Sequence, residues 1–283
     1  MVDVVVLNYN DAEQTCRYVS LIKEFDIIDH IVIVDNHSSD FSIEYLKTIE
    51  DDKVKIIQSG KNGGYGYGNN FGIKYLIKNY CSPYIAITNP DVIFEEKCLI
   101  KCVDFLYEHQ SQNYAVVAPR MKELKDGFNK NGWLLPGWLD YICFDLFLLG
   151  KIFRLTYVDT CGKSYSDCDC VAGSMLVINS SMFLDAGMFD ENIFLYCEET
   201  ALGFRLKDKG YKTALLTNQE FIHEHSVSIN KTISSKLKQY KLIWKSRMYI
   251  LDTYYELNGI KRLMSKIIKD VASLEMLVKV KIK

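Results

Sequence analysis

Short apolar runs alternate with longer amphipathic stretches in the first third of the chain. Residues 2–7, 30–34, 54–58 and 84–88 form short runs rich in β-branched side chains, which is typical of strands buried on both faces. The segments between these runs carry apolar side chains at helical spacing. Strands that alternate with helices predict βαβ units and a parallel sheet covered by helices on both faces.

Local signals mark the start of one helix and the position of later strands. Asn10, with Glu13 three residues further on, resembles a capping pair, so we expect the first helix to begin there. Apolar runs at 115–119, 170–178 and 211–216 predict three further strands. The second half of the chain therefore continues the sheet of the first half.

Polar side chains follow the predicted strands at the point where each strand ends. Asn8 and Tyr9 follow the first strand, Asp35 follows the second, and Asp91 follows the fourth, which Pro90 terminates because it cannot donate to a ladder. Open α/β sheets bind their ligands at this edge. Tyr9 could pack on a base and Asp35 could accept hydrogen bonds from a nucleoside. Asp91 is a candidate metal ligand or charge partner, with a helix cap as the alternative.

A glycine-rich segment at residues 61–72 follows the third predicted strand. A dinucleotide-binding fingerprint would instead follow the first strand. We interpret residues 66–70, Gly-Tyr-Gly-Asn-Asn, as a close backbone approach with amide hydrogen bonding to a phosphate or sugar. An ordinary turn from loop to helix remains the alternative.

The composition indicates a globular protein with a sizeable core, and its charge is distributed unevenly along the chain. The chain has 283 residues, of which 48% are hydrophobic, enough for one large domain or a domain with an appendage. Residues 231–283 carry 13 Lys and Arg against 4 Asp and Glu, a net charge of +9 within a chain of net charge −2. A basic tail on an acidic body predicts a surface for an anionic partner, or else a solvated helical face.

Cysteine usage and the amino-terminal sequence favour a cytoplasmic protein. The nine cysteines are an odd number and lack zinc-site spacing, so we expect reduced cysteines that lie mostly in the core. A strand follows Met1 almost directly, without the pattern of a signal peptide. No run reaches the roughly 18 uncharged residues of a membrane span.

Four motifs that occur in order along the chain carry a family resemblance. They read Val-Val-Val-Leu-Asn-Tyr-Asn at 4–10, Val-Asp-Asn-His-Ser-Ser-Asp at 34–40, Asn-Gly-Gly-Tyr-Gly-Tyr-Gly-Asn-Asn-Phe-Gly at 62–72 and Thr-Asn-Pro-Asp-Val at 88–92. The chain resembles an inverting family 2 glycosyltransferase with the GT-A fold, and within that family its rhamnosyltransferase-like branch. There Asn-Pro-Asp stands where other members carry Asp-x-Asp.

The resemblance implies a fold and a division of the chain. The fold would be α/β, with a GT-A, Rossmann-like, mixed and mainly parallel sheet flanked by helices. Residues 1–228 would form the glycosyltransferase domain, with a nucleotide-binding half at 1–92 and an acceptor and catalytic half at 93–228. Residues 229–283 would form a basic helical extension.

The resemblance also implies a donor site and a divalent metal, Mn²⁺ or Mg²⁺, as cofactor. Asp35 would contact the nucleoside, Asp91 would bind the metal on the donor diphosphate, and His223 would complete this site. If this segment is extended, His223 and His225 would point to opposite faces and only one would reach the metal, so we favour His223. The expected donor-binding residues are Leu7, Asn8, Tyr9, Asp35, Asn36, Asn62, Gly64, Tyr65, Gly68, Asn69, Asn89 and Asp91.

Two adjacent acids, Glu198 and Glu199, stand where the family carries its catalytic base. Inverting transfer needs a carboxylate within hydrogen-bond reach of the acceptor hydroxyl. Burial and mutual repulsion can raise the pKa of one member of such a pair. We expect Glu199 to be the base and Glu198 its support, although Ala201 replaces a later acid of the family; a simple helix-start pair is the alternative. The expected acceptor contacts are Gly173, Tyr196 and Arg205.

Two segments outside these motifs suggest contact with a membrane. Residues 133–155 are too apolar for an ordinary surface loop, so they are either an acceptor-side or membrane-facing element or a helix packed on the core or in a dimer. The tail from 231 is helical in pattern and is broken at Gly259. Residues 260–283 form a basic amphipathic pattern, which predicts peripheral attachment to an anionic membrane.

The sequence therefore predicts a metal-dependent inverting hexosyltransferase. The favoured donor is dTDP-L-rhamnose, and the favoured acceptor is a lipid-linked saccharide of a capsule or cell-wall polysaccharide. The alternatives are a UDP-sugar donor (galactose, galactofuranose or N-acetylhexosamine) and a non-catalytic protein that binds nucleotide sugars. We expect attachment to the inner face of the cell membrane and no nucleic-acid partner, and a homodimer stays open.

Overall fold

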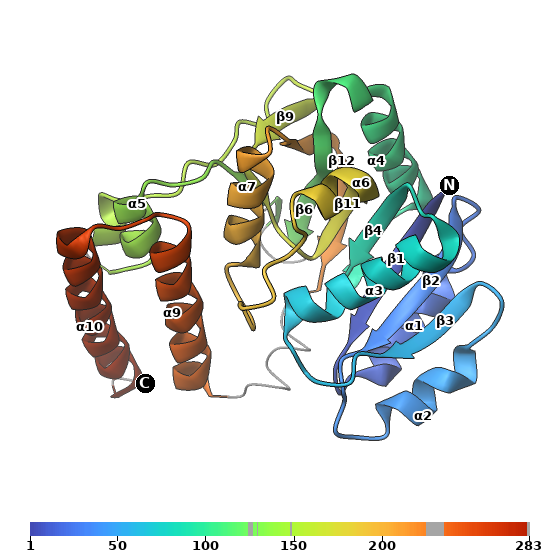
Figure 1. Cartoon of the computed structure of the whole chain (residues 1–283), viewed down its shortest axis with the longest axis horizontal. Helices are drawn as coiled ribbons and strands as arrows, with labels where there is room; N and C mark the ends of the chain where they lie inside the picture. Colours follow the sequence, from blue (N-terminus) through green and yellow to red (C-terminus); the bar gives the residue numbers. More distant parts are fainter. Residues whose placement is uncertain (124–126, 129, 148, 225–234, 282–283) are drawn as a thin grey trace.

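The structure is a computed structural model, and it describes residues 1–123, 127–128, 130–147, 149–224 and 235–281 (Figure 1). The strands are β1 Val2–Asn8, β2 Ile28–Asp35, β3 Val54–Gln58, β4 Tyr84–Thr88, β5 Val92–Ile93, β6 Tyr114–Glu123, β7 Gly127–Phe128, β8 Gly132–Trp133, β9 Tyr165–Cys168, β10 Cys170–Val171, β11 Met175–Asn179 and β12 Lys212–His223. The helices are α1 Ala12–Ile22, α2 Ser42–Leu46, α3 Tyr65–Tyr80, α4 Glu96–Glu108, α5 Trp138–Cys143, α6 Ser180–Asp185, α7 Glu198–Asp208, α9 Lys236–Thr253 and α10 Gly259–Lys281.

One mixed sheet organises the molecule, in the strand order β3-β2-β1-β4-β11-β6-β12-β5. The strands β3, β2, β1 and β4 run parallel, as the alternating pattern predicted. In the second half, β11 enters antiparallel between β4 and β6, and β12 runs parallel to β6. The predicted α/β sheet flanked by helices is confirmed, and its antiparallel pairs lie in the second half.

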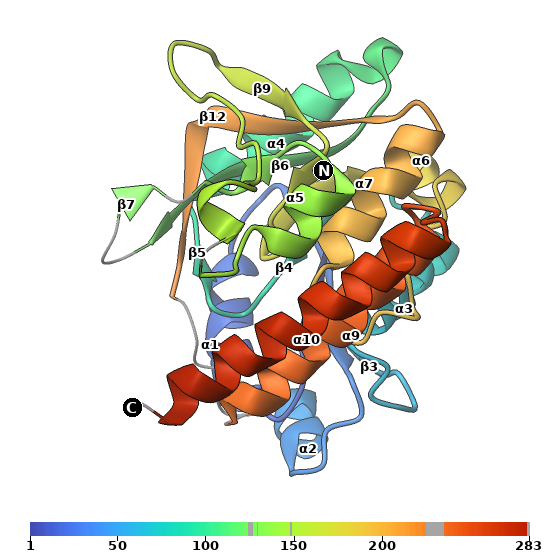
Figure 2. The same ribbon diagram turned by 90° about the vertical axis from the view of Figure 1, so that its left-hand side faces the viewer.

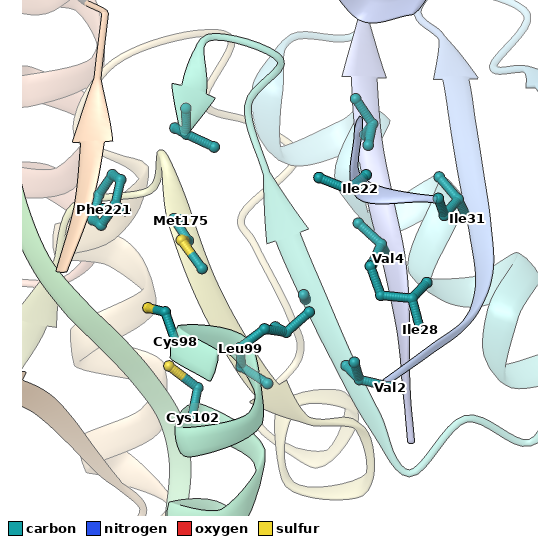
Figure 3. Packing of buried hydrophobic residues seen from close by; sticks show 14 of the residues in the cluster. Val2, Val4, Ile22, Ile28, Ile31, Cys98, Leu99, Cys102, Met175 and Phe221 are labelled. Carbon is teal, nitrogen blue, oxygen red and sulfur yellow. The ribbon is translucent and has the colours of Figure 1, made fainter. Parts of the chain in front are cut away.

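Helices cover both faces of this sheet, which explains why its strands are continuous apolar runs. On one face Val4 and Ile31 pack with Ile22 of α1 and Leu99 of α4 (Figure 3). On the other face the alternate side chains, such as Val5, pack against α3. The nine cysteines form no disulfide, and six of them are buried, which agrees with the expected core role.

The first helix is not capped as the sequence suggested. Asn10 has a left-handed backbone with φ of 53°, and the cap position of α1 is Asp11, which makes no side-chain capping bond. The backbone N–H of Asn10 donates to the hydroxyl of Ser38, and the Asn10 amide oxygen accepts from the N–H of Ser39. The capping prediction is wrong because this residue, which tolerates left-handed geometry, bonds across to the loop after β2.

Part of the apolar segment at 133–155 packs inside the molecule, whereas Leu134, Phe147 and Ile152 are exposed. Its helix α5 contributes Tyr141 and Ile142 to a third core cluster, together with Trp244 of α9, Ala272 of α10 and Ala201 of α7. Figure 2 shows α10 running along α9 with α5 beside them. The alternative of a helix packed on the core therefore holds for α5.

The carboxyl-terminal helices share this core with the rest of the chain. Arg247 of α9 is buried and forms a bidentate ion pair with Asp145 at 2.8 and 3.1 Å. The domain boundary expected at 228 lies outside the described residues. Within the described ranges, no helix is both long enough and apolar enough to cross a membrane.

Candidate active site

Asn8 and Asp35 meet at the carboxyl ends of β1 and β2, where the strand register pairs them. The Asn8 amide donates to Asp35 Oδ1 at 3.0 Å, and Gln58 donates to Asp35 Oδ2 at 3.2 Å. The backbone N–H of Ser38 also donates to Oδ2, and both Asn8 and Asp35 are buried. Tyr9 is partly exposed at the same edge. These hydrogen bonds hold the Asp35 carboxylate in place, and both of its oxygens already accept hydrogen bonds. A nucleoside that contacts Asp35 would add to these bonds.

The glycine segment joins the two halves of the molecule. Gly64 has φ of 92°, and a Cβ there would overlap the carbonyl oxygen of Phe194. The next residue, Tyr65, donates its backbone N–H to the same oxygen at 3.0 Å. The Asn36 amide donates to the Gly64 carbonyl and to Asn62. Glycine is therefore required at 64 because backbone from the second half lies directly against it.

The later glycines and amides of this segment, at 66–72, lie inside α3 rather than in a loop. A Cβ on Gly68 would overlap the side chain of Leu7, so this glycine sets the distance between α3 and β1. The Asn69 amide donates to the Tyr65 carbonyl at 3.0 Å. Leu7, Gly68 and Asn69 are thus packed where the helix begins, and their expected contacts with the donor stay a prediction.

Asp91 and His223 come together because β5 pairs with the end of β12. The register sets Val92 opposite His223, and the backbone N–H of Glu224 donates to the Asp91 carbonyl at 2.9 Å. Asp91 Oδ1 lies 3.2 Å from His223 Nε2 in a nearly buried pair. Asn89, also in this turn, donates its backbone N–H to the carbonyl of Ser174.

These two side chains offer the start of a metal site. Asp91 Oδ1 is buried and, apart from its ion-pair contact with His223, makes no hydrogen bond within the described part of the chain. A carboxylate oxygen beside an imidazole nitrogen suits Mn²⁺, and Mg²⁺ is usually held by one or two carboxylates, phosphates and water. The described residues contain no group of three or more His, Cys, Asp or Glu that could hold a metal. A metal bound by Asp91 and His223 would therefore need further oxygen atoms from a bound ligand. The alternative histidine, His225, lies outside the described residues.

A strained turn directly precedes the two acids, Glu198 and Glu199. Tyr196 and Cys197 have φ of 70° and 72°, a left-handed pair without glycine, directly before α7 begins at Glu198. Such backbone persists only where surrounding contacts hold it, and it gathers at functional sites. Glu198 is buried and its Oε1 makes no hydrogen bond within the described residues, whereas Glu199 is partly exposed.

Gly173 and Tyr65 surround the more exposed acid. The Gly173 N–H donates to Glu199 Oε1 at 3.3 Å, and the Tyr65 hydroxyl donates to the Gly173 carbonyl at 2.5 Å. Burial, followed by the nearby Glu199 and Glu198 carboxylates, raises the pKa of Tyr65 well above its usual range, so this hydroxyl stays a donor. Of the expected acceptor contacts, Gly173 and Tyr196 therefore adjoin the acid pair.

Burial separates the roles of the two acids. It is the main cause that raises the pKa of Glu198 to about 8, and the neighbouring Glu199 carboxylate adds to it. Burial also raises the pKa of Glu199. Since Glu198 is the more deeply buried, it keeps its proton near neutral pH. At Glu199 the hydrogen bonds from the Gly173 N–H and from the helix backbone favour the charged form and oppose the rise of its pKa. A partly exposed carboxylate at the amino end of α7 is the arrangement a general base needs.

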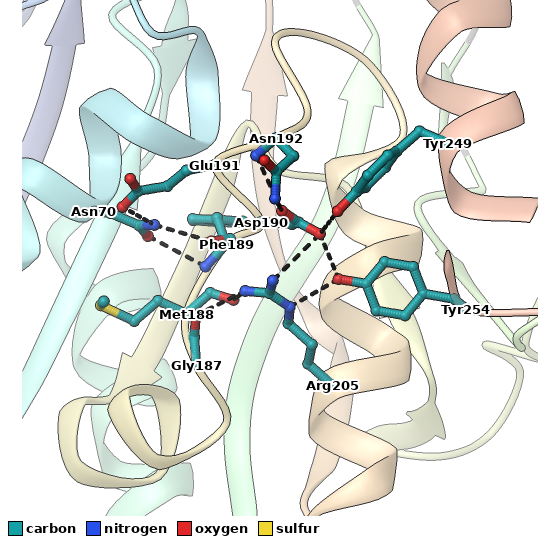
Figure 4. A network of polar contacts seen from close by, with 10 residues as sticks. All are labelled: Asn70, Gly187, Met188, Phe189, Asp190, Glu191, Asn192, Arg205, Tyr249 and Tyr254. Atoms are coloured by element: carbon teal, nitrogen blue, oxygen red, sulfur yellow. Dashed lines mark hydrogen bonds and ion pairs between the residues drawn. The ribbon is translucent and has the colours of Figure 1, made fainter. Parts of the chain in front are cut away.

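Arg205 lies in a polar network that the sequence did not reveal (Figure 4). Its guanidinium reaches Asp190 Oδ2 at 3.2 Å, the Tyr254 hydroxyl at 2.8 Å and the Gly187 carbonyl at 2.7 Å. These contacts show that Arg205 positions a loop, and its expected contact with the acceptor stays a prediction. The sequence of this loop, which includes Phe-Asp-Glu at 189–191, contains no local signal for its contacts with Tyr249 and Tyr254.

Comparison with known proteins places this chain in a family. The family model described as Glycosyl transferase family 2 matches residues 3–163. The low-salt glycan biosynthesis hexosyltransferase Agl10 of Haloferax volcanii is 26% identical over 234 residues, which is 82% of this chain and 70% of that protein. The rhamnosyltransferase WbbL of Escherichia coli K12 is 26% identical over 196 residues, 65% of this chain and 69% of that protein.

A solved structure shares the fold. The mannosyltransferase PcManGT from Pyrobaculum calidifontis, solved in complex with GDP-Man and Mn²⁺, superposes with a TM-score of 0.58 at 12% identity, covering 96% of this chain and 70% of that one. At that identity the likeness shows the fold alone. Together with the mixed sheet, it confirms the GT-A, Rossmann-like α/β fold.

The raised pKa of Glu198 predicts a pH-dependent stability. Between the ordinary value of 4.5 and about 8, the folded protein holds a proton on Glu198 that the unfolded chain has released. The unfolding free energy should therefore fall as pH rises through this window, by up to about 1.4 kcal/mol per pH unit. Glu198→Gln should remove this loss, so urea denaturation at pH 5, 6.5 and 8 should give a flatter profile for the variant.

Glu108→Gln, at an exposed position on α4, is the matched control and should follow the wild type. Parallel profiles for the wild type and Glu198→Gln would contradict the assignment of a buried, protonated Glu198.

Proposed function

Because the chain belongs to glycosyltransferase family 2, we propose that it transfers a sugar with inversion from a nucleoside diphosphate donor to a saccharide hydroxyl. The observation that carries this proposal is the acid pair at the start of α7, with a protonated Glu198 behind a partly exposed Glu199. The strained turn at Tyr196 and Cys197 presents this pair, and the glycine segment of the donor half lies directly against the same loop.

Each group of residues then has a part in the reaction. Asn8 and Asp35 orient the nucleoside, while Asp91 and His223 hold Mn²⁺ or Mg²⁺ against the donor diphosphate. When bound, the metal supplies charge neutralisation to the leaving diphosphate. Glu199 accepts the proton of the acceptor hydroxyl as the new glycosidic bond forms and the bond to the diphosphate breaks. Glu198 keeps its proton and supports Glu199.

The proposed donor is dTDP-L-rhamnose, and the proposed acceptor is a lipid-linked saccharide. The Asn-Pro-Asp motif at 89–91 and the similarity to a rhamnosyltransferase support this donor. The similarity to a glycan biosynthesis hexosyltransferase supports a growing glycan as the acceptor. UDP-sugars are the second candidates for the donor, because the identity to both relatives is only 26%.

Thermal unfolding with nucleotides tests the donor and metal assignments together. We expect dTDP or UDP with Mn²⁺ or Mg²⁺ to raise the melting temperature, since a ligand at about 100 times its Kd stabilises by roughly 2.7 kcal/mol. Asp91→Asn should abolish the metal-dependent part of this shift. The control Asp26→Asn, at an exposed position distant from Asp91 in the sequence, should retain the metal-dependent shift. No shift of the wild type with any nucleotide would remove the donor-site proposal.

Turnover separates the two acids. Glu199→Gln should lower kcat by about 10²- to 10⁴-fold, the usual contribution of a general base. Glu198→Gln should lower it far less, because glutamine resembles a protonated glutamate in shape and in hydrogen bonding. Both variants should bind the nucleotide normally. Equal losses would contradict the assignment of the base, and a wild type that binds nucleotide sugars without turnover would favour the non-catalytic alternative.

Helix α10 supports a proposal of peripheral membrane attachment. Ile260, Leu263, Ile267 and Leu274 are all more than half exposed and recur at helical spacing on one face, while Ser265 and Ala272 are buried. Residues 259–276 of α10 carry four basic and two acidic side chains, and the tail as a whole is strongly basic. An apolar stripe on a basic helix fits the surface of an anionic membrane, and we propose the inner face of the cell membrane.

Vesicle flotation tests this attachment. The wild type should float with vesicles that contain phosphatidylglycerol and should float much less with pure phosphatidylcholine. Leu263→Ser with Ile267→Ser should abolish flotation, whereas Leu21→Ser with Leu184→Ser, two exposed leucines elsewhere, should not. If the stripe variant floats as well as the wild type and only loses a dimer by size analysis, the stripe is a subunit interface instead.

A further inference from the structure

The loop that carries the two acids is fixed by side chains from three helices (Figure 4). Asp190, buried in this loop, accepts hydrogen bonds at Oδ2 from the hydroxyls of Tyr249 at 2.9 Å and Tyr254 at 2.6 Å. Its Oδ1 accepts from the backbone N–H and the amide of Asn192, both at 3.0 Å. Arg205 of α7 completes the set with an ion pair at 3.2 Å.

Helix α9 forms hydrogen bonds with this loop at two positions, Asp190 and Leu195. Beside the two tyrosines, the hydroxyl of Ser246 donates to the Leu195 carbonyl at 2.8 Å. Ser246 and Tyr249 lie three residues apart on one face of α9. Tyr254 follows five residues later, just past the end of the helix, and its hydroxyl reaches the same carboxylate. Elsewhere on α9, Trp244 and Ile250 are buried in the third core cluster, so the helix is held in place independently of these hydroxyls.

Helix α3 holds the loop from the opposite side. The Asn70 amide oxygen accepts the N–H of Phe189 at 3.2 Å, and its amide nitrogen donates to the Phe189 carbonyl at 2.9 Å. The Tyr65 N–H donates to the Phe194 carbonyl. The loop is therefore a bridge, with the donor half on one side and α9 on the other.

The bonds from α9 are strong ones because Asp190 is ionised. Burial by itself would raise the pKa of this carboxyl, but the hydrogen bonds from Tyr254 and Asn192 and the nearby Arg205 guanidinium lower it. Hydrogen bonds to a carboxylate are roughly twice as strong as those between neutral groups. Removing a tyrosine hydroxyl therefore weakens the loop more than an average surface contact would.

We propose that Tyr249 and Tyr254 are positioning residues of the transfer reaction, acting through Asp190 on the turn that presents Glu199. The left-handed Tyr196 and Cys197 lie between Asp190 and the acids, and strained backbone of this kind needs contacts on both sides to persist. Helix α9 thereby belongs to the catalytic unit, separately from any role of α10 at a membrane. The catalytic part of this inference rests on the proposed function, whereas the mechanical part does not.

The test compares Tyr249→Phe, Tyr254→Phe and their double variant with Tyr240→Phe, which removes a hydroxyl from the same helix outside the network. Hydrogen exchange of the full chain, read by mass spectrometry over residues 189–199, should be about 10-fold faster in the double variant and unchanged in the control. With the donor that the wild type turns over, kcat should fall by about 10- to 100-fold in the double variant. The KM for the donor should stay within about 2-fold, because the loop residues in question do not form the donor site.

The outcomes separate this inference from the proposed function. Exchange and kcat of the double variant equal to those of Tyr240→Phe would overturn it. Faster exchange over the whole chain, with kcat unchanged, would also overturn it, since the tyrosines would then serve general stability. If the wild type turns over no donor, the proposed function fails, and faster exchange confined to 189–199 would still support the mechanical role of α9.

Discussion

One close contact sets how the glycine segment meets the second half of the molecule: the carbonyl oxygen of Phe194 lies against Gly64 and accepts the N–H of Tyr65. A side chain at position 64 would overlap that oxygen, so the contact exists only because a glycine stands there. It fixes the amino end of α3, which belongs to the donor half, against the loop that leads to Glu198 and Glu199. The donor side and the acids are thus held by the same piece of backbone, which suits a reaction whose two substrates must meet in a fixed geometry.

The acid pair illustrates how a buried carboxyl group is tolerated. Charged carboxylates lose hydration when they are buried, and two adjacent ones repel each other. Here Glu198 takes up a proton, while Glu199 keeps some exposure and accepts the N–H of Gly173 at the amino end of α7. The cost of burial is therefore concentrated on Glu198, the acid that the proposed mechanism does not use as the base.

The carboxyl-terminal helices change the interpretation of a residue that departs from the family pattern. Ala201, where the resemblance implies a further acid, is fully buried in the cluster that α5, α9 and α10 form. A carboxylate at that position would lie among Tyr141, Trp244 and other apolar side chains without water, which is strongly unfavourable. The absence of an acid at position 201 therefore goes together with the apolar packing that surrounds α7.

The sequence by itself determined the parallel half of the sheet and the family. Strands buried on both faces must be continuous apolar runs, so the runs at 2–7 and 84–88 stood out, and the motifs after them carried the resemblance. Only the tertiary structure decided which distant groups meet. Asp91 contacts His223 because β5 pairs with β12, and Asp190 accepts a hydrogen bond from Tyr254. Asn10 does not cap α1 and instead donates its backbone N–H to Ser38. Local patterns report the period and burial of a segment, whereas strand order and long-range hydrogen bonds depend on how separate segments pack, and no local pattern encodes that.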